Sequence, residues 1–370
     1  MRGLIILEEI IKQLGKRYKL QEIPKMNEKE ITNELPSVSI IILTYNGKRH
    51  LKECFESIEQ LNYPKNKREV IMVDNASSDG SVEYIKKNFP SIKILHLSKN
   101  YGYAGGNNRG SKIANGEYIV FLNQDIIVNS NWLFELINSM QENTDIKICG
   151  SKNLQKDKNK VLTFGGYLTI VGGGTGENIV DATQKIQKDT RLIGYAAGSS
   201  LVVEKKAFEY LSGFDETYFM YDEECDFCWR AWLYGYKVAV LPSAIVWRNA
   251  DNDSKKREKF LFHIIKNQLM SVLKNFELHN LIYALLISFF YNSFQIVKYL
   301  LLRRPHSIAD IIKAHLFVIR NLPEILKKRK IIQKNRKISD KELYEMGLIL
   351  PLSESIKKEI SLSKREYHGI

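Results

Sequence analysis

Four carboxylates crowd one short stretch of this 370-residue chain. They are Asp222, Glu223, Glu224 and Asp226. Crowded carboxylates raise one another's pKa, and a carboxylate with a raised pKa suits general-base catalysis. The alternative is helix capping, because the helix dipole favours acidic residues in a first turn and Asp226 can pair with Arg230 one turn later. Four carboxylates exceed what capping needs, so we predict a general base in this stretch.

Polar side chains follow three predicted strands at the point where each strand ends. They are Thr44, Tyr45 and Asn46, then Asp74 and Asn75, then Asn123, Gln124 and Asp125. Ligands of open α/β sheets bind outside the carboxyl ends of the strands. Asp74 suits the base or ribose of a nucleotide, and Asp125 suits a divalent cation that holds a diphosphate. An ordinary turn with a helix cap at 74–80 and an ordinary loop at 123–125 are the alternatives.

A glycine-rich segment at 100–110 lies between these strand ends in the sequence. We expect a loop that runs into a helix, whose backbone amides approach a phosphate while Arg109 adds positive charge. The first strand is followed by Thr-Tyr-Asn-Gly rather than Gly-x-Gly-x-x-Gly, and the chain has no P-loop. These patterns argue against a Rossmann dinucleotide site or a P-loop site.

The elements that must position these residues follow an alternating rhythm. Short β-rich runs alternate with helical stretches, with strands predicted at 38–43, 69–74, 92–97 and 118–122 and helices ending near 60 and beginning near 81. This alternation predicts βαβ units and a mixed, mostly parallel sheet. After about residue 143, glycine pairs predict hairpins and loops, followed by a strand at 200–204 and a helix at 223–234.

Five motifs, in this order, resemble the family 2 glycosyltransferases, and most closely their rhamnosyltransferase-like branch. The motifs are VSIIILTYN at 38–46, VDNASSDGS at 73–81, GGNNRG at 105–110, FLNQD at 121–125, and GFDE at 213–216 with EECDFCWR at 223–230. The resemblance covers residues 36–250. It implies a GT-A fold and inverting transfer of a sugar from a nucleotide diphosphate sugar, with Mg²⁺ or Mn²⁺ as the cofactor.

Residue by residue, the resemblance implies specific roles. The positions that match donor-binding residues are Thr44, Tyr45, Asn46, Asp74, Asn75, Gly106, Asn107, Asn108, Arg109 and Asn123. Asp125 matches the metal-binding last Asp of a D-x-D-like motif whose first Asp is here Asn123. The catalytic Glu-Asp pair falls on Glu223 and Glu224, which places Glu224 as the general base and makes Asp226 a further catalytic candidate.

One departure from the family pattern concerns the metal. This branch often has Val-Trp-His after its last strand, whereas this chain has Arg248 in place of the His. Arginine cannot ligate a cation, so either the metal is held without it or Arg248 itself neutralises the diphosphate. Further along the chain, residues 263–267 match a basic residue followed by Asn that lies near the acceptor in the family.

The positive charge of the chain is concentrated near its C-terminus. The formal net charge is +13, and residues 251–337 hold 18 Lys and Arg against 6 Asp and Glu. Within them, Leu281–Leu302 is mostly apolar but is interrupted by Asn292, Gln295 and Lys298. We expect an amphipathic or re-entrant helix on an anionic lipid surface. A true transmembrane span and a solvated helical bundle are the alternatives.

These patterns predict four parts in the chain. They are an N-terminal amphipathic helix with a linker (1–35), a GT-A catalytic domain (36–252), a basic, partly apolar helical membrane-associating region (253–340) and a tail (341–370). The four cysteines make no disulfide framework, Cys225 and Cys228 have no second pair for a zinc site, and the short apolar run at 4–7 makes no signal peptide. We expect peripheral or monotopic association with the cytoplasmic face of the cell membrane.

The predicted function is inverting transfer of a hexosyl or rhamnosyl group, in polysaccharide biosynthesis, to a hydroxyl of a glycan or lipid-linked glycan acceptor. A GT-A protein that binds sugar nucleotides without transfer is the first alternative. A basic nucleic-acid-binding protein is the second, but no recognition signature for nucleic acid is present, so we expect no nucleic-acid partner. The sequence predicts neither the donor sugar nor the oligomeric state.

Overall fold

The computed structural model describes residues 35–156, 161–163, 165–176, 190–248, 260–355 and 357. The chain divides into two units, Met1–Pro36 and Ser37–Ile370, and nearly all the described residues belong to the second unit. The predicted N-terminal helix lies outside the described residues, as does the tail beyond residue 357.

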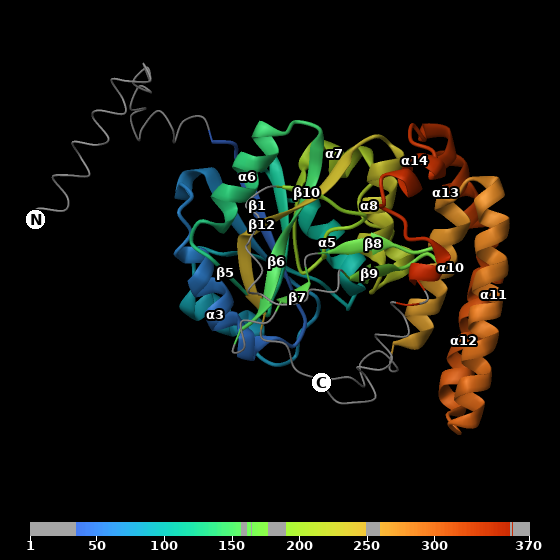
Figure 1. The fold of residues 1–370 in the computed structure, drawn as a ribbon. Helices are drawn as coiled ribbons and strands as arrows, with labels where there is room; N and C mark the ends of the chain where they lie inside the picture. Colours follow the sequence, from blue (N-terminus) through green and yellow to red (C-terminus); the bar gives the residue numbers. More distant parts are fainter. Residues whose placement is uncertain are drawn as a thin grey trace, which may run out of the picture. The chain divides into compact units, whose positions relative to one another are not determined.

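A ten-stranded sheet forms the centre of the second unit (Figure 1). Four parallel strands lie in the order β3-β2-β1-β4, with bounds β1 Val38–Thr44, β2 Arg68–Asp74, β3 Lys93–His96 and β4 Tyr118–Asn123. The sheet continues through antiparallel β11 (Ser200–Glu204) to β6 (Ile146–Gln155), β12 (Lys237–Arg248) and β10 (Arg191–Leu192). Because β6 and β12 are parallel to each other, the predicted mixed, mostly parallel sheet is confirmed.

Two shorter strands pair with strands that lie inside this order. β5 (Ile126–Val128) pairs with β12, and β7 (Val161–Thr163) pairs with β6. β8 (Gly166–Leu168) and β9 (Gly174–Gly176) form a separate antiparallel pair, so the predicted hairpin in the glycine-rich region is confirmed.

Helices connect the strands and cover the sheet. They are α3 (Lys48–Glu59), α4 (Ser81–Asn88), α5 (Gly102–Lys112), α6 (Trp132–Glu142), α7 (Lys205–Tyr210) and α8 (Glu223–Leu233). α5 packs on β1 and β2, while α6 packs on β6 and β12. The central strands are therefore buried on both faces, which explains why β1 reads as a continuous apolar run rather than an alternating one.

The backbone register brings the carboxyl ends of the parallel strands to one edge, as expected. Thr44 aligns with Asp74, and Leu43 aligns with Asn123. Asp74 in turn aligns with His96 at the end of β3. We call the ends of these four strands, Thr44, Asp74, His96 and Asn123, the strand-end edge.

Two segments differ from the sequence-based expectation. The expected glycine-rich loop is largely helix, because α5 begins at Gly102. In addition, β6 is a ten-residue central strand in a region where only hairpins and loops were expected. Its sequence, IKICGSKNLQ, contains Gly150, Lys152 and Asn153, which break the apolar pattern that identifies a strand.

The C-terminal region is helical, as predicted. It comprises α10 (Leu261–Asn275), α11 (Leu278–Leu301), α12 (Pro305–Arg320), α13 (Leu322–Asn335) and α14 (Asp340–Glu345). α10 packs against α8, α12 and α13. One continuous hydrophobic core includes Phe121 of the sheet, Trp229 of α8, Phe276 after α10 and Ile332 of α13. The C-terminal helices and the sheet are thus parts of one packed body, while the boundary predicted near residue 252 falls outside the described residues.

Candidate active site

Asp74 and His96 form a pair at the strand-end edge. Asp74 is fully buried, and its Oδ2 lies 2.6 Å from Nδ1 of His96, whose side chain is 63% exposed. The other oxygen, Oδ1, accepts a hydrogen bond from the backbone N–H of Ser77 at 3.1 Å. Sequence reasoning missed His96, although its place at the end of the neighbouring strand is the signal that could have found it. The pair presents an exposed imidazole above a buried carboxylate.

The residues that follow β1 are held by side chains from neighbouring strand ends. The amide of Gln124 brackets the backbone of Tyr45, accepting its N–H at 3.0 Å and donating to its carbonyl at 3.3 Å. Asn46 has a positive φ of 48° and accepts the N–H of Ser78 at 2.8 Å. The ring of Tyr45 is left exposed, while Thr44 is fully buried and its Oγ1 has no partner among the described residues.

Asn75 fixes the entry to α5. Its Nδ2 donates to Oδ1 of Asn100 at 2.9 Å and to the carbonyl of Gly102 at 3.1 Å, while its Oδ1 accepts the N–H of Tyr101 at 2.9 Å. Gly102 has a φ of +71°, and a Cβ there would lie 2.1 Å from the carbonyl oxygen of Phe219. The side chain of Asn75 therefore positions backbone, and Gly102 permits close contact with the segment that precedes α8.

Two of the predicted donor-binding residues on α5 have their side chains turned to protein partners. Asn108 forms two hydrogen bonds with the backbone of Phe214, accepting its N–H at 3.0 Å and donating to its carbonyl at 2.8 Å. The guanidinium of Arg109 lies over the ring of Tyr101 and pairs with Glu216 at 3.1 Å. The structure thus brings both residues to the 214–216 segment.

Gly106 allows α5 to lie close to β1. A Cβ on Gly106 would lie 2.4 Å from Cδ1 of Leu43, so only glycine allows α5 to approach β1 this closely. The sequence-based expectation that this glycine-rich stretch forms a phosphate-binding loop is not what the structure shows, because residue 106 lies inside a helix. Gly106 thus serves helix-to-sheet packing, whereas Gly102 permits the contact with Phe219.

Asn107 differs from its neighbours on α5. It is 1% exposed, and neither Nδ2 nor Oδ1 has a hydrogen-bond partner among the described residues. Tyr103, one helical turn earlier on the same face, donates its hydroxyl proton to the carbonyl of Gly198. Burying an unpaired amide is unfavourable, so the side chain of Asn107 is suited to a polar ligand.

The segment before α8 has a strained backbone. Phe219, Tyr221 and Asp222 all have positive φ values, 65°, 68° and 60°, which are costly for residues other than glycine. Nδ2 of Asn267 on α10 donates to three carbonyl oxygens of this segment, those of Tyr218, Met220 and Tyr221, at 3.2, 2.9 and 2.7 Å. α10 thereby stabilises the strained conformation.

Glu223 and Glu224 follow this strained segment and begin α8. Burial, and then Glu224, raise the pKa of Glu223 well above its ordinary value. Burial, followed by Asp222, raises the pKa of Glu224 to about 7, although the N–H of Gly198 acts in the opposite direction. One oxygen of each carboxyl, Oε2, is buried without a partner among the described residues. Near neutral pH, therefore, Glu224 can exchange a proton, and the pKa of its neighbour Glu223 is raised in the same direction.

Asp226 belongs to a buried ion network. It is fully buried, Oδ2 pairs with Arg230 at 2.9 Å, and Oδ1 pairs with Lys274 at 3.0 Å. Burial raises the pKa of Asp226, but Lys274 and Arg230 outweigh it and hold the pKa below its ordinary value. Because both oxygens are engaged by protein cations, we assign Asp226 to structure rather than to catalysis.

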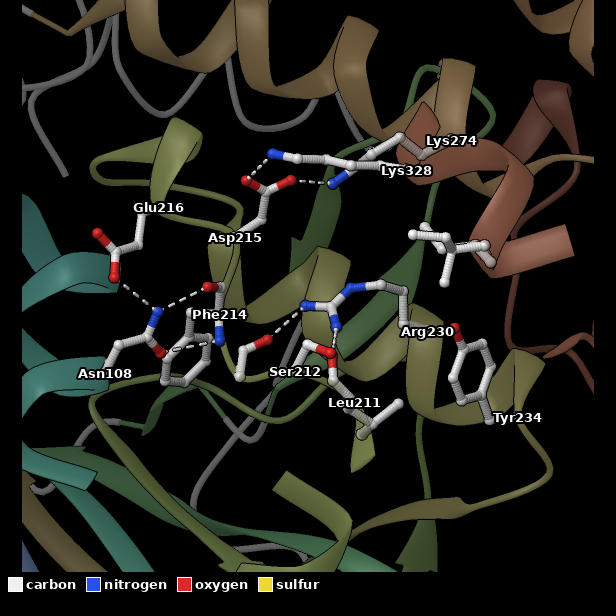
Figure 2. Close-up of a pocket in the computed structure, with 13 residues that line it drawn as sticks. Asn108, Leu211, Ser212, Phe214, Asp215, Glu216, Arg230, Tyr234, Lys274 and Lys328 are labelled. Atoms are coloured by element: carbon white, nitrogen blue, oxygen red, sulfur yellow. Dashed lines mark hydrogen bonds and ion pairs between the residues drawn. The ribbon is translucent and has the colours of Figure 1, made fainter. Parts of the chain in front are cut away.

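A cavity of about 330 Å³ adjoins this ion network (Figure 2). Asp215 projects into it between Lys274 and Lys328, each 2.7 Å away. Arg230 binds the carbonyls of Leu211 and Gly213 on its wall, the latter at 2.9 Å. The cavity lies behind the 211–216 segment, and none of its lining residues belongs to the strand-end edge or to the Glu223–Glu224 pair. We interpret it as part of the support for the strained segment.

Asp125 pairs with Arg248. Nε of Arg248 lies 2.8 Å from Oδ2 of Asp125. The expected metal site depends on this carboxylate. Residue 123, which would supply a second carboxylate if it were Asp, is Asn. In the described part of the chain, no group of three His, Cys, Asp or Glu side chains could hold a metal ion. Asp125 is paired with a guanidinium and has no second carboxylate at residue 123, so the residues present are a poor fit for a divalent cation, and Mg²⁺ or Mn²⁺ bound through Asp125 stays a prediction.

Comparisons with known proteins agree with this fold. Residues 39–211 match the model of "Glycosyl transferase family 2". The chain is 27% identical over 204 residues to the low-salt glycan biosynthesis hexosyltransferase Agl10 of Haloferax volcanii, and the match covers 53% of this chain and 62% of that protein. It is 25% identical over 218 residues to poly-beta-1,6-N-acetyl-D-glucosamine synthase of Staphylococcus epidermidis, covering 58% of this chain and 50% of that protein. The chain therefore spans between half and two thirds of these relatives, and neither match points to a rhamnosyltransferase.

Solved structures show the same fold. The mannosyltransferase PcManGT from Pyrobaculum calidifontis, in complex with GDP-Man and Mn²⁺, has a TM-score of 0.50 at 17% identity, covering 78% of this chain and 76% of that chain. GalNAc-T7, with UDP, GalNAc and Mn²⁺, has a TM-score of 0.52 at 17% identity, covering 65% of this chain and 48% of that chain. At these identities the likeness shows the fold alone, and the predicted GT-A architecture is confirmed.

Proposed function

Because residues 39–211 carry a glycosyl transferase family 2 domain with the GT-A fold, we propose that the protein transfers a sugar from a nucleotide diphosphate sugar to an acceptor hydroxyl. The observation that carries this proposal is the Glu223–Glu224 pair. Burial raises the pKa of both carboxyls, and each leaves one buried oxygen without a partner among the described residues. Buried carboxyls with raised pKa values are typical of acid and base roles.

In this proposal, Glu224 is the general base. Its ionised carboxylate removes the proton of the acceptor hydroxyl while that oxygen attacks the anomeric carbon in line. The new bond from the acceptor oxygen to the sugar forms as the bond from the sugar to the diphosphate breaks, and the nucleoside diphosphate leaves with the bonding electrons. The configuration at the anomeric carbon inverts, and Glu224 later releases its proton to water.

The donor would lie along the strand-end edge. Asp74 and the exposed imidazole of His96 suit the nucleoside, and the unpaired amide of Asn107 suits the sugar or the diphosphate. The sequence-based expectation of a hexosyl or rhamnosyl donor remains a proposal. Glycan and lipid-linked glycan acceptors are also proposals, supported by an exposed apolar surface on the C-terminal helices.

Release of nucleoside diphosphate tests this function. The protein is incubated with UDP-, GDP- and dTDP-sugars and a membrane glycolipid extract as acceptor, and the Glu224→Gln variant is the matched control because it keeps the shape but cannot take a proton. We expect acceptor-dependent release with one donor and a rate at least about 100-fold lower in the variant. Donor binding without turnover in the parent protein would instead support a binding protein. Equal rates in parent and variant would contradict the role of Glu224.

A further inference from the structure

The Asp125–Arg248 pair is fixed by the backbone as well as by its side chains. β5 pairs with the end of β12 in antiparallel register, so that Arg248 aligns with Ile126, the residue after Asp125. The side chain of Asp125 is 17% exposed and that of Arg248 is 39% exposed. The guanidinium therefore lies beside the end of β4, at the strand-end edge, with part of its surface open to solvent.

Arg248 supplies a positively charged group at this position without any bound ion. An arginine keeps its proton at all physiological pH values, and its planar group binds phosphate oxygens through two hydrogen bonds at once. A divalent cation at Asp125 would compete with this guanidinium for Oδ2 and would find no second carboxylate at residues 123 and 124, which are Asn and Gln. Coordination of Mg²⁺ or Mn²⁺ here is therefore disfavoured.

Arg248 and Glu223 both act electrostatically on Tyr221, in the segment before α8. Burial raises the pKa of Tyr221, Arg248 lowers it, and Glu223 raises it. When the anomeric carbon of a donor faces Glu224, its diphosphate would lie between the end of β4 and that base. This step rests on the proposed function.

We propose that Arg248, oriented by Asp125, is the protein's own counter-charge for the donor diphosphate, so that donor binding and transfer need no divalent cation. The guanidinium holds the diphosphate oxygens in the ground state and balances the charge that develops on the leaving group. Asp125 is a positioning residue, because it holds the guanidinium rather than the donor.

Calorimetric titration of the full chain with UDP, GDP and dTDP tests the proposal. Each titration is made in excess EDTA and again with Mn²⁺. We expect one nucleotide to bind in EDTA with an affinity within about threefold of that in Mn²⁺. Binding that requires Mn²⁺ would overturn the proposal and leave the proposed function standing. Absence of binding by all three nucleotides in both conditions would overturn both.

Substitutions at Arg248 sharpen the test. In EDTA, Arg248→Ala should weaken diphosphate binding by about 10- to 100-fold, the usual range for a hydrogen bond to a charged group, and Arg248→Lys should weaken it less. Arg248→His removes the competing cation, so any binding it recovers should depend on Mn²⁺. Arg320→Ala, an exposed arginine of α12, is the matched control and should bind as the parent does. A normal affinity of Arg248→Ala, with a folded thermal transition, would contradict the proposal.

Discussion

At the scale of single residues, the pKa of Glu224 predicts how the reaction depends on pH. A base must be deprotonated, and the pKa of this carboxyl is raised to about 7. We expect kcat/KM to rise about tenfold per pH unit below pH 6 and to level off above pH 8. Initial rates between pH 5 and 9 check this, with circular dichroism at each pH to confirm that the protein is folded. A flat profile between pH 5 and 8 would exclude Glu224 as the base.

The same carboxyl should make stability depend on pH in the opposite direction. Its folded pKa of about 7 exceeds the ordinary value of 4.5, so the folded protein holds a proton that the unfolded chain releases. This contribution to the free energy of unfolding is fully present below about pH 4.5 and is lost as pH rises through 7. We expect Glu224→Gln to exceed the parent in unfolding free energy at pH 8, by at most about 3 kcal/mol, and to match it near pH 4.5.

Urea unfolding at pH 4.5, 6 and 8 measures this difference. The matched control is Glu142→Gln, because Glu142 is an exposed residue of α6 whose side chain accepts a hydrogen bond from Asn138 one turn earlier in that helix. The control should differ from the parent by the same amount at every pH. If the gain of Glu224→Gln is likewise independent of pH, the carboxyl does not titrate as described.

Substitution of Asn107 should lower activity while leaving stability nearly unchanged. Its buried amide bonds to no described residue, so Asn107→Ala removes no protein hydrogen bond and should change the unfolding free energy by less than about 1 kcal/mol. Donor affinity or transfer rate should nevertheless fall at least tenfold. Its neighbour Asn108 supplies the control, since Asn108→Ala loses two hydrogen bonds to Phe214 and should lose stability instead. A fully active Asn107→Ala variant would remove Asn107 from the donor site.

At the scale of elements, α10 stabilises the strained backbone that precedes Glu223 and Glu224. Asn267→Ala removes the donor to three carbonyls of the strained 218–221 backbone and should cost about 1 to 3 kcal/mol of unfolding free energy. The turnover rate should fall with it, because Glu223 and Glu224 follow this segment directly. Asn138→Ala, which removes a hydrogen bond to Glu142 within α6 and far from this segment in the chain, is the control. An unchanged turnover rate in a destabilised Asn267→Ala protein would show that the segment keeps its conformation without α10.

The individual strands and helices were the part of the fold that could be predicted from the sequence. The strands ending at Thr44, Asp74 and Asn123 are dense in β-branched residues and end in polar ones, so local pattern identifies both the strand and its end. α5 was misplaced because its glycines indicate a loop locally. Only the contact between Gly106 and Leu43 explains them as part of a helix.

The candidate site was predictable only where its residues follow a strand or begin a helix. The ion pair of Asp125 with Arg248 depends on the register between β5 and β12, which lie more than 100 residues apart in the chain. The contact between His96 and Asp74 likewise depends on the pairing of β2 with β3. No local pattern carries these pairings, so the contacts of Arg248 with Asp125 and of His96 with Asp74 required the structure.

At the scale of the whole molecule, the C-terminal helices present an apolar surface. By length and composition, α11 is the one helix in the described ranges that could cross a membrane, and 22% of its apolar stretch is buried. The exposed apolar side chains of this surface include Ile282, Leu286, Phe289, Phe290, Phe294, Val297 and Leu301 on α11 and Ile312, Leu316 and Ile319 on α12. Exposed basic residues accompany them at Arg303, Arg304, Lys313 and Arg320. An apolar surface of this kind marks an interaction site.

We expect this surface to bind anionic bilayers with its apolar side chains embedded. Each buried side chain contributes about 1.5 to 3 kcal/mol, and each Lys or Arg near the surface contributes about 1 kcal/mol that salt screens. Truncation near residue 252 is not a suitable test, because α10 and α13 share the core of the sheet. The double variant Leu286→Glu, Phe290→Glu removes the apolar contact and leaves that core intact.

Flotation with neutral and anionic vesicles, at low and high salt, measures the binding. The parent should float with anionic vesicles, and high salt should release part of it. The double variant should remain at the bottom, whereas Met346→Glu, a change at an exposed apolar residue after α14, should float as the parent does. A parent protein that never floats would mean that α11 and α12 cover another protein surface instead, such as a second copy of this chain. The proposal of a lipid-linked acceptor would then lose its structural support, while a soluble glycan acceptor would remain compatible with the same base and donor site.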